Sequence, residues 1–147
     1  MSYMTIPFSL RMDEETHDEL TTHVQRLDVN ASKLVNRYVK EGLRMDKHPA
    51  ISFKTTAQGR RAAVLAAHPG IQVVDVIGTW KAERQDAVKA ARYLHIAEDE
   101  VQAILRYYAG YRDEVERDLK EHLETQQNYK RVLEHREAQV RRRVANG

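Results

Sequence analysis

The chain has 147 residues, enough for one ordinary domain or two small ones, and 31% of them are charged. A mean hydropathy of −0.69 excludes a membrane-spanning segment, and the absence of cysteine excludes disulfides and thiolate metal sites. Since the net charge is only +2, a nucleic-acid partner has to be inferred from where the charges lie.

The first predicted element is a strand at residues 5–12, TIPFSLRM, in which every second residue is apolar. Asp13 follows as the expected N-cap of a helix, and a turn at residues 28–30 ends that helix. Asn30 then caps a second amphipathic helix. Because a lone strand leaves its backbone hydrogen-bonding groups unpaired, we expect it to pair with the same strand of a second chain.

Such pairing predicts an intertwined homodimer whose ribbon has two faces. The outer face carries Thr5, Ser9 and Arg11, which point to solvent or to a partner. The inner face packs on the helices of both chains. The predicted dimer core consists of Ile6, Phe8, Leu10, Met12, Leu20, Val24, Leu34, Val35 and Tyr38.

Residues 5–44 resemble the ribbon-helix-helix family of bacterial repressors, of the CopG, Arc and MetJ type. The resemblance lies in FSLRMDEETHDELTTHVQRLDVNASKLVNRYVKEGL, with its alternating strand, acidic helix start and central turn. Two positions depart from the family: Asp28, where members often have glycine, and Pro7 on the outer face, which has no side-chain donor.

The resemblance implies that the ribbon enters the major groove of double-stranded operator DNA. Arg11 would be the strongest base reader, because its fork matches guanine O6 and N7, and Thr5 and Ser9 would be less selective. The start of the second helix would contact phosphate through Asn30, Ala31, Ser32 and Lys33. Each of these residues, taken singly, also suits an ordinary surface position.

Residues 47–50 are predicted to be a linker, and a hairpin is expected beyond it. Its strands are Ile51-Ser52-Phe53 and residues 61–66, around a Gln58-Gly59 turn, although the alanine-rich second strand also suits a helix. Helices are expected near residues 72–83, 86–95 and 98–109, and a long one from about 112. Since Tyr107 and Tyr108 are adjacent and cannot both face one core, we expect one at an interface.

Residues 51–118 resemble, in a few generic motifs, small helical domains of VapB-type bacterial antitoxins and of the related DUF433 family. The shared features are Gly59-Arg60, the apolar helix after Pro69-Gly70, and IAEDEVQAILRYYAGYRDEVERDL. This resemblance implies an antitoxin whose partner is often a PIN-domain ribonuclease. The same stretch also has the lengths of a second helix-turn-helix reader, but Glu98, Asp99 and Glu100 would then face phosphates, so a structural role is favoured.

Residues 119–147 form a basic helical tail with seven Lys or Arg against four Glu and few large apolar residues. We predict that it is partly disordered alone and orders on a partner. A solvated charged helix and a basic DNA clamp are the alternatives. The candidate toxin-binding residues are Tyr129, Leu133, Arg136, Arg141, Arg142 and Arg143.

The predicted fold is mainly α with a short β-ribbon. It comprises a ribbon-helix-helix domain (residues 1–46), a linker (47–50), a hairpin with a helical bundle (51–118) and a long C-terminal helix (119–147). The predicted function is sequence-specific repression by a cytoplasmic homodimer that can associate further on DNA, as an antitoxin that represses its own operon and neutralises a toxin. The alternatives are a stand-alone regulator whose middle domain serves oligomerisation, and a protein-interaction adaptor with a vestigial ribbon.

An enzyme is not expected, because the sequence has no phosphate loop, no G-x-G-x-x-G and no H-E-x-x-H. Neither a cofactor nor a metal is expected, since the seven histidines never cluster at ligand spacing. Its carboxylate pairs, such as Glu14-Glu15 and Asp99-Glu100, lie at predicted helix starts, where acidic residues stabilise the helix.

Overall fold

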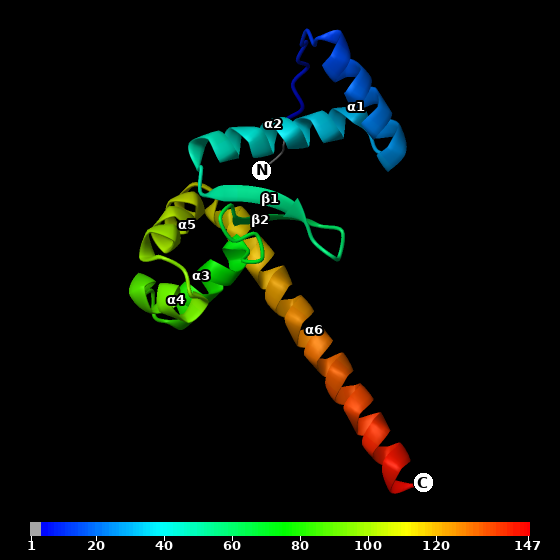
Figure 1. The fold of residues 1–147 in the computed structure, drawn as a ribbon, viewed down its shortest axis with the longest axis vertical. Helices are drawn as coiled ribbons and strands as arrows, with labels where there is room; N and C mark the ends of the chain where they lie inside the picture. The colour runs from blue at the N-terminus through cyan, green and yellow to red at the C-terminus, as the bar shows by residue number, and fades with distance from the viewer. Residues whose placement is uncertain (1–3) are drawn as a thin grey trace. The chain divides into compact units, whose positions relative to one another are not determined.

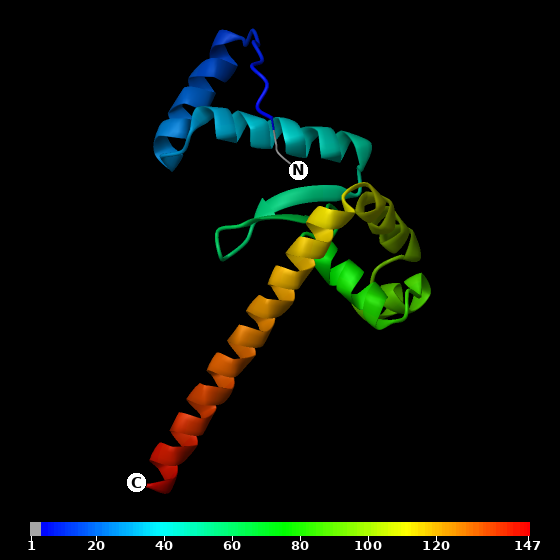
Figure 2. The same ribbon diagram turned by 180° about the vertical axis from the view of Figure 1, so that it is seen from behind.

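The computed structural model describes residues 4–147, which are mainly helical with one small antiparallel sheet (Figures 1 and 2). The chain forms two compact units, unit 1 (Met1–Leu43) and unit 2 (Arg44–Gly147). No helix in the described residues is both long enough and apolar enough to cross a membrane. In order, the elements are α1 (Glu14–Leu27), α2 (Ala31–Lys47), β1 (Ile51–Thr55), β2 (Arg61–Leu65), α3 (Val73–Ala82), α4 (Ala87–Leu94), α5 (Glu98–Gly110) and α6 (Arg112–Ala145).

Unit 1 contains α1 and all but the last turn of α2, joined by a tight turn (Figure 1). The carboxylate of Asp13 caps α1 by accepting hydrogen bonds from the backbone N–H and the hydroxyl of Thr16, at 2.8 and 2.9 Å. Asp28 ends α1 in the left-handed conformation, φ 51° and ψ 50°, which glycine adopts most easily and Asp tolerates. Asn30 caps α2 by accepting from the backbone N–H of Lys33 at 3.1 Å. Both predicted caps and the turn are confirmed.

The strand predicted at residues 5–12 is not formed in the single chain, where residues 4–13 are neither strand nor helix. Among residues 4–147 the first regular element is the helix α1, so the ribbon-helix-helix arrangement is not confirmed. The physical reason is the lack of a partner: among the described residues the two strands, β1 and β2, pair with each other. The coarser prediction of a mainly helical chain with a small sheet and a long C-terminal helix is confirmed.

The hairpin of unit 2 pairs β1 and β2 in antiparallel register, with Ile51 opposite Leu65. Gly59 lies in the turn at φ 80°, a backbone conformation that residues with a side chain rarely adopt. Its N–H donates to the carbonyl of Thr56 at 2.9 Å, which closes the turn. The predicted hairpin is confirmed, and the alanine-rich segment is a strand because it pairs along its whole length with β1.

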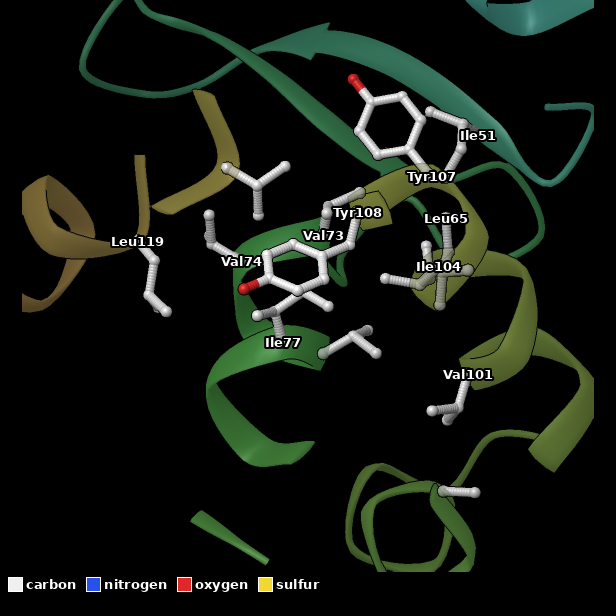
Figure 3. Close-up of a cluster of buried hydrophobic side chains, with 13 residues drawn as sticks. Ile51, Leu65, Val73, Val74, Ile77, Val101, Ile104, Tyr107, Tyr108 and Leu119 are labelled. Carbon is white, nitrogen blue, oxygen red and sulfur yellow. The ribbon is translucent and has the colours of Figure 1, made fainter. Parts of the chain in front are cut away.

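The core of unit 2 lies between the hairpin and the helices α3, α5 and α6 (Figure 3). Ile77 of α3 and Ile104 of α5 are fully buried in it. Gly78 allows α6 to approach α3 closely, because a Cβ at this position would lie 3.3 Å from Cδ1 of Leu119. The three helices expected with both bounds are present within one or two residues of them, and the long fourth helix begins at Arg112 as expected.

Both tyrosines at the end of α5 are buried, so the prediction that one of them is an interface residue is wrong. Tyr107 accepts a hydrogen bond from Arg44 at 3.0 Å, whereas Tyr108 packs edge-on against Trp80 and hydrogen-bonds to Glu116. Unit 2 therefore has elements on both sides of α5, with Tyr107 near β1 and Tyr108 near α3 (Figure 3). Adjacent residues of one helix can both be buried when the helix is covered on two sides.

We expect Ile104→Ala to lower the free energy of unfolding of unit 2 by about 2–5 kcal/mol, because it leaves a cavity in a packed core. The matched control is Gln102→Ala on the exposed side of the same helix, which should change stability by less than about 0.5 kcal/mol. Urea unfolding followed by the fluorescence of Trp80, the single tryptophan, measures both. Equal effects of the two substitutions would contradict the assignment of the core.

Candidate nucleic-acid interface

The residues predicted to read bases all lie in the irregular segment before α1. Thr5, Ser9 and Arg11 are exposed there. The alternating apolar residues of the same segment are also exposed, with Ile6 at 76% and Phe8 at 86% of their full accessible area. Because the segment is not a strand in the single chain, the structure does not sort these residues onto two faces.

The predicted dimer core of unit 1 is incompletely buried in the single chain. None of the residues of α1 is buried, and among the described apolar side chains of unit 1 only Leu34 is buried. Large apolar side chains left exposed next to one another indicate an interaction surface. Of the predicted core, Met12, Leu20, Val24 and Val35 are half-buried, and Ile6, Phe8, Leu10 and Tyr38 are exposed.

The start of α2 has the features of an anion-binding helix end. The backbone N–H groups of Ala31 and Ser32 lie in the first turn, where no preceding carbonyl of the helix can accept from them. The first turn of α2 contains no acidic residue, in contrast to α1 and α5. Asn30, Ala31, Ser32 and Lys33 are all exposed.

The alternative reader helix, α5, begins with three acidic residues as the sequence indicated. Its N-cap, Ala97, provides no side-chain hydrogen bond, so the acids of the first turn are what favours the helix end. Glu100 also lies 3.4 Å from Nε2 of His68. The acidic side chains at this helix end therefore repel phosphate, and one of them, Glu100, is near His68 of unit 2.

The candidate toxin-binding residues lie on the C-terminal half of α6, which projects beyond the other elements of unit 2 (Figures 1 and 2). Tyr129, Leu133 and Arg136 are exposed, as are the three arginines at residues 141–143. Arg141 lies 3.8 Å from Glu137 of the same helix. The structure places these residues on one continuous helix and shows no partner for the exposed half of it among the described residues.

A charged network that the sequence did not indicate holds the last turn of α2, which belongs to unit 2, to α5 and α6. Arg44 donates to Glu114 at 2.5 Å and to Tyr107 at 3.0 Å, and its guanidinium lies 4.0 Å from the ring centre of Tyr111. Burial is the largest single influence on the pKa of Arg44 and would lower it. The hydrogen bonds to Glu114 and Tyr107 and the charges of these two groups together outweigh burial, so the pKa is raised. Residues this far apart in the chain carry no local pattern that links them.

Residues 47–50, predicted as a linker, also belong to unit 2. Unit 2 begins at Arg44, so the last turn of α2 and the segment after it both belong to unit 2. The ring of His48 lies edge-on to that of Tyr107, with the ring centres 5.3 Å apart. The backbone N–H of Ile51 donates to the carbonyl of His48 at 2.9 Å, which leads the chain directly into β1.

No known protein family, curated protein or solved structure matched the sequence. In residues 4–147 no three His, Asp or Glu side chains gather as metal ligands would.

The pKa of Asp13 is lowered by the hydrogen bond from the backbone N–H of Thr16 and by the Thr16 hydroxyl. Because the folded-state pKa is depressed, the cap stabilises α1 above the ordinary Asp pKa of about 3.9, and this stabilisation disappears as the pH falls through the folded-state pKa. We expect the amide resonance of Thr16 to titrate with a midpoint below about 3.9.

Asp13→Asn is the control for this titration, because the amide retains an acceptor oxygen but cannot be protonated in this range. It should keep α1 capped and remove the titration of the Thr16 amide. A midpoint at or above the ordinary value in the unsubstituted protein would show that the cap is absent in solution.

Proposed function

We propose that the chain is a sequence-specific DNA-binding repressor that works as a homodimer, with unit 1 supplying both the dimer contact and the DNA contact. The observation that supports this is the set of elements in unit 1: an alternating segment whose apolar side chains are exposed, and two capped amphipathic helices whose apolar side chains, except that of Leu34, are not buried in one chain. A unit of this kind needs a second copy to complete its core.

Pairing two copies of residues 5–12 about a two-fold axis would supply hydrogen-bond partners for the backbone and bury the apolar side chains of the segment. The backbone groups gain hydrogen-bond partners, and the period of two puts the apolar side chains on one face. Ile6, Phe8 and Leu10 then face the helices, and burying each contributes about 1.5–3 kcal/mol. This contribution offsets the conformational entropy that the segment gives up when it becomes ordered.

The outer face of such a ribbon carries side chains suited to the major groove. A two-stranded ribbon fits that groove, and the Arg11 guanidinium can bind guanine O6 and N7 together. Thr5 and Ser9 belong to the same alternating set as Arg11, and their hydroxyls both donate and accept. The two-fold axis would present each of these side chains twice, so the DNA site would be a pseudo-palindrome.

The charges of unit 1 restrict the side from which DNA can approach. Glu14 and Glu15, at the start of α1, would repel phosphates. The start of α2 has no acid in its first turn and carries Lys33 beside the backbone donors of that turn. The ribbon and the start of α2 are therefore the surfaces that we assign to DNA.

Two substitutions separate base reading from phosphate binding on DNA selected by the protein from a random pool. Arg11→Ala should cost roughly 1–3 kcal/mol on the selected site and much less on random DNA. Lys33→Ala should weaken both alike and reduce the slope of log K against log salt by about 0.9 for each phosphate that the lysine neutralises. Fluorescence anisotropy at several salt concentrations measures both effects.

Lys89→Ala, an exposed lysine of α4 in unit 2, is the control and should change neither affinity nor salt slope. If Arg11→Ala weakens selected and random DNA equally, Arg11 reads no base. If the random pool yields no enriched sequence at all, the proposed function is wrong.

A further inference from the structure

The C-terminal half of α6 is a long helix without a core beneath it. α6 has 34 residues, and its buried residues, Val115 and Leu119, both lie in its first third. The part beyond residue 124 would extend about 30 Å at 1.5 Å per residue, and it contacts no other element of unit 2 in either view (Figures 1 and 2). Because most helical stability in proteins comes from packing of an apolar face, a helical segment without such packing is only marginally stable in water.

The uncovered half nevertheless continues the apolar stripe that the first third buries. At 3.6 residues per turn, Tyr129, Leu133 and Val140 fall within an arc of about 40°, and Val115 and Leu119 fall within about 40° of the same arc. Tyr129 is 66% exposed and Val140 59%. One face of the helix is thus packed on α3 at its start and open to solvent at its end.

The charges beside the stripe complement those of a second copy of the same helix that runs in the opposite direction. Lys130 and Glu137 lie on the same flank of the stripe, seven residues apart. If Tyr129 of one chain faces Val140 of the other, Lys130 of each chain comes beside Glu137 of its partner, twice by symmetry. Glu137 is exposed and its contact with Arg141 at 3.8 Å is of little value, so it can take part in this pairing.

Parallel pairing of the same faces is disfavoured. It would place Arg136, which lies at the edge of the stripe, directly against its own copy. In the antiparallel arrangement Arg136 lies beside Leu133 of the partner, where its aliphatic stem can cover the leucine and its guanidinium can reach solvent. Two copies of this helix face therefore complement each other when they run antiparallel but not when they run parallel.

We propose that the C-terminal halves of α6 from two chains pair antiparallel, with Tyr129 of each chain facing Val140 of the other. This contact is independent of the ribbon of unit 1 and of DNA binding. A chain with both contacts would assemble beyond a dimer unless the two contacts join the same two chains. A toxin or another protein would have to displace the second copy to use this face of α6.

The absence of cysteine in the chain allows a clean cross-linking test in the full-length protein. Tyr129→Cys and Val140→Cys are made separately, each with Leu10→Asp, which prevents the ribbon of unit 1 from pairing. In the antiparallel arrangement two copies of one variant hold their cysteines about 16 Å apart along the helices, too far for a disulfide. An equimolar mixture of the two variants, equilibrated and then mildly oxidised, should form a disulfide-linked heterodimer.

The matched control is the pair Arg131→Cys and Ala138→Cys, which has the same midpoint along the helix but lies on the opposite face. Their mixture should not cross-link. Cross-linking of Tyr129→Cys with itself would overturn the antiparallel direction. Failure of the Tyr129→Cys and Val140→Cys mixture to cross-link, with the protein monomeric in sedimentation, would overturn the self-contact and leave α6 to another partner or to solvent.

A charge exchange tests the flanking pair in the same Leu10→Asp protein without cysteines. Glu137→Lys should raise the dissociation constant of the α6 contact roughly tenfold, because two attractive pairs become repulsive. Adding Lys130→Glu should restore it, since the exchanged charges again face each other across the axis. If the double variant associates no better than Glu137→Lys, the two residues do not meet between chains. Sedimentation equilibrium measures all three proteins.

Discussion

Unit 1 leaves apolar side chains exposed that one copy of it does not bury, and the proposed dimer depends on this constraint. α1 is capped at both ends and α2 at its start, so the lack of a core does not come from poorly formed elements. Phe8, the most exposed large apolar side chain among the described residues of unit 1, lies in a segment with no regular structure of its own. Exposed apolar side chains and unpaired backbone groups in one segment are both satisfied by strand pairing with a second chain.

Unit 2 differs because its strands, its core side chains and the half-buried Arg44 find their partners within the unit. Its strands pair with each other, its helices close over a core that contains Ile77 and Ile104, and Arg44 is held by Glu114 and Tyr107. The C-terminal half of α6 is the exception, since it extends the apolar stripe past the end of the core. The two open surfaces of the chain, in unit 1 and on α6, are therefore where we assign contacts between chains. The toxin partner stays a prediction.

The sequence predicted the elements that depend on local chemistry. Asp13, Asn30 and Gly59 mark a helix start, a second helix start and a turn, and each works through groups within four residues of itself. The sequence did not predict the features that depend on contacts between segments far apart in the chain. The spacing of Tyr107 and Tyr108 did not reveal that α5 is covered on two sides, and no pattern linked Arg44 to Glu114. The alternation at residues 5–12 indicates a strand only if a partner is present, which a single chain does not provide.

The central claim is that residues 5–12 of two chains pair with each other, and NMR on a mixture of labelled and unlabelled protein tests it most directly. Isotope-filtered spectra of the equilibrated mixture report contacts between protons of different chains. We expect such contacts between the backbones of residues 6–10 of the two chains, together with contacts from Phe8 of one chain to α2 of the other. A monomeric protein in which residues 4–13 show no contact between chains at millimolar concentration would contradict the claim.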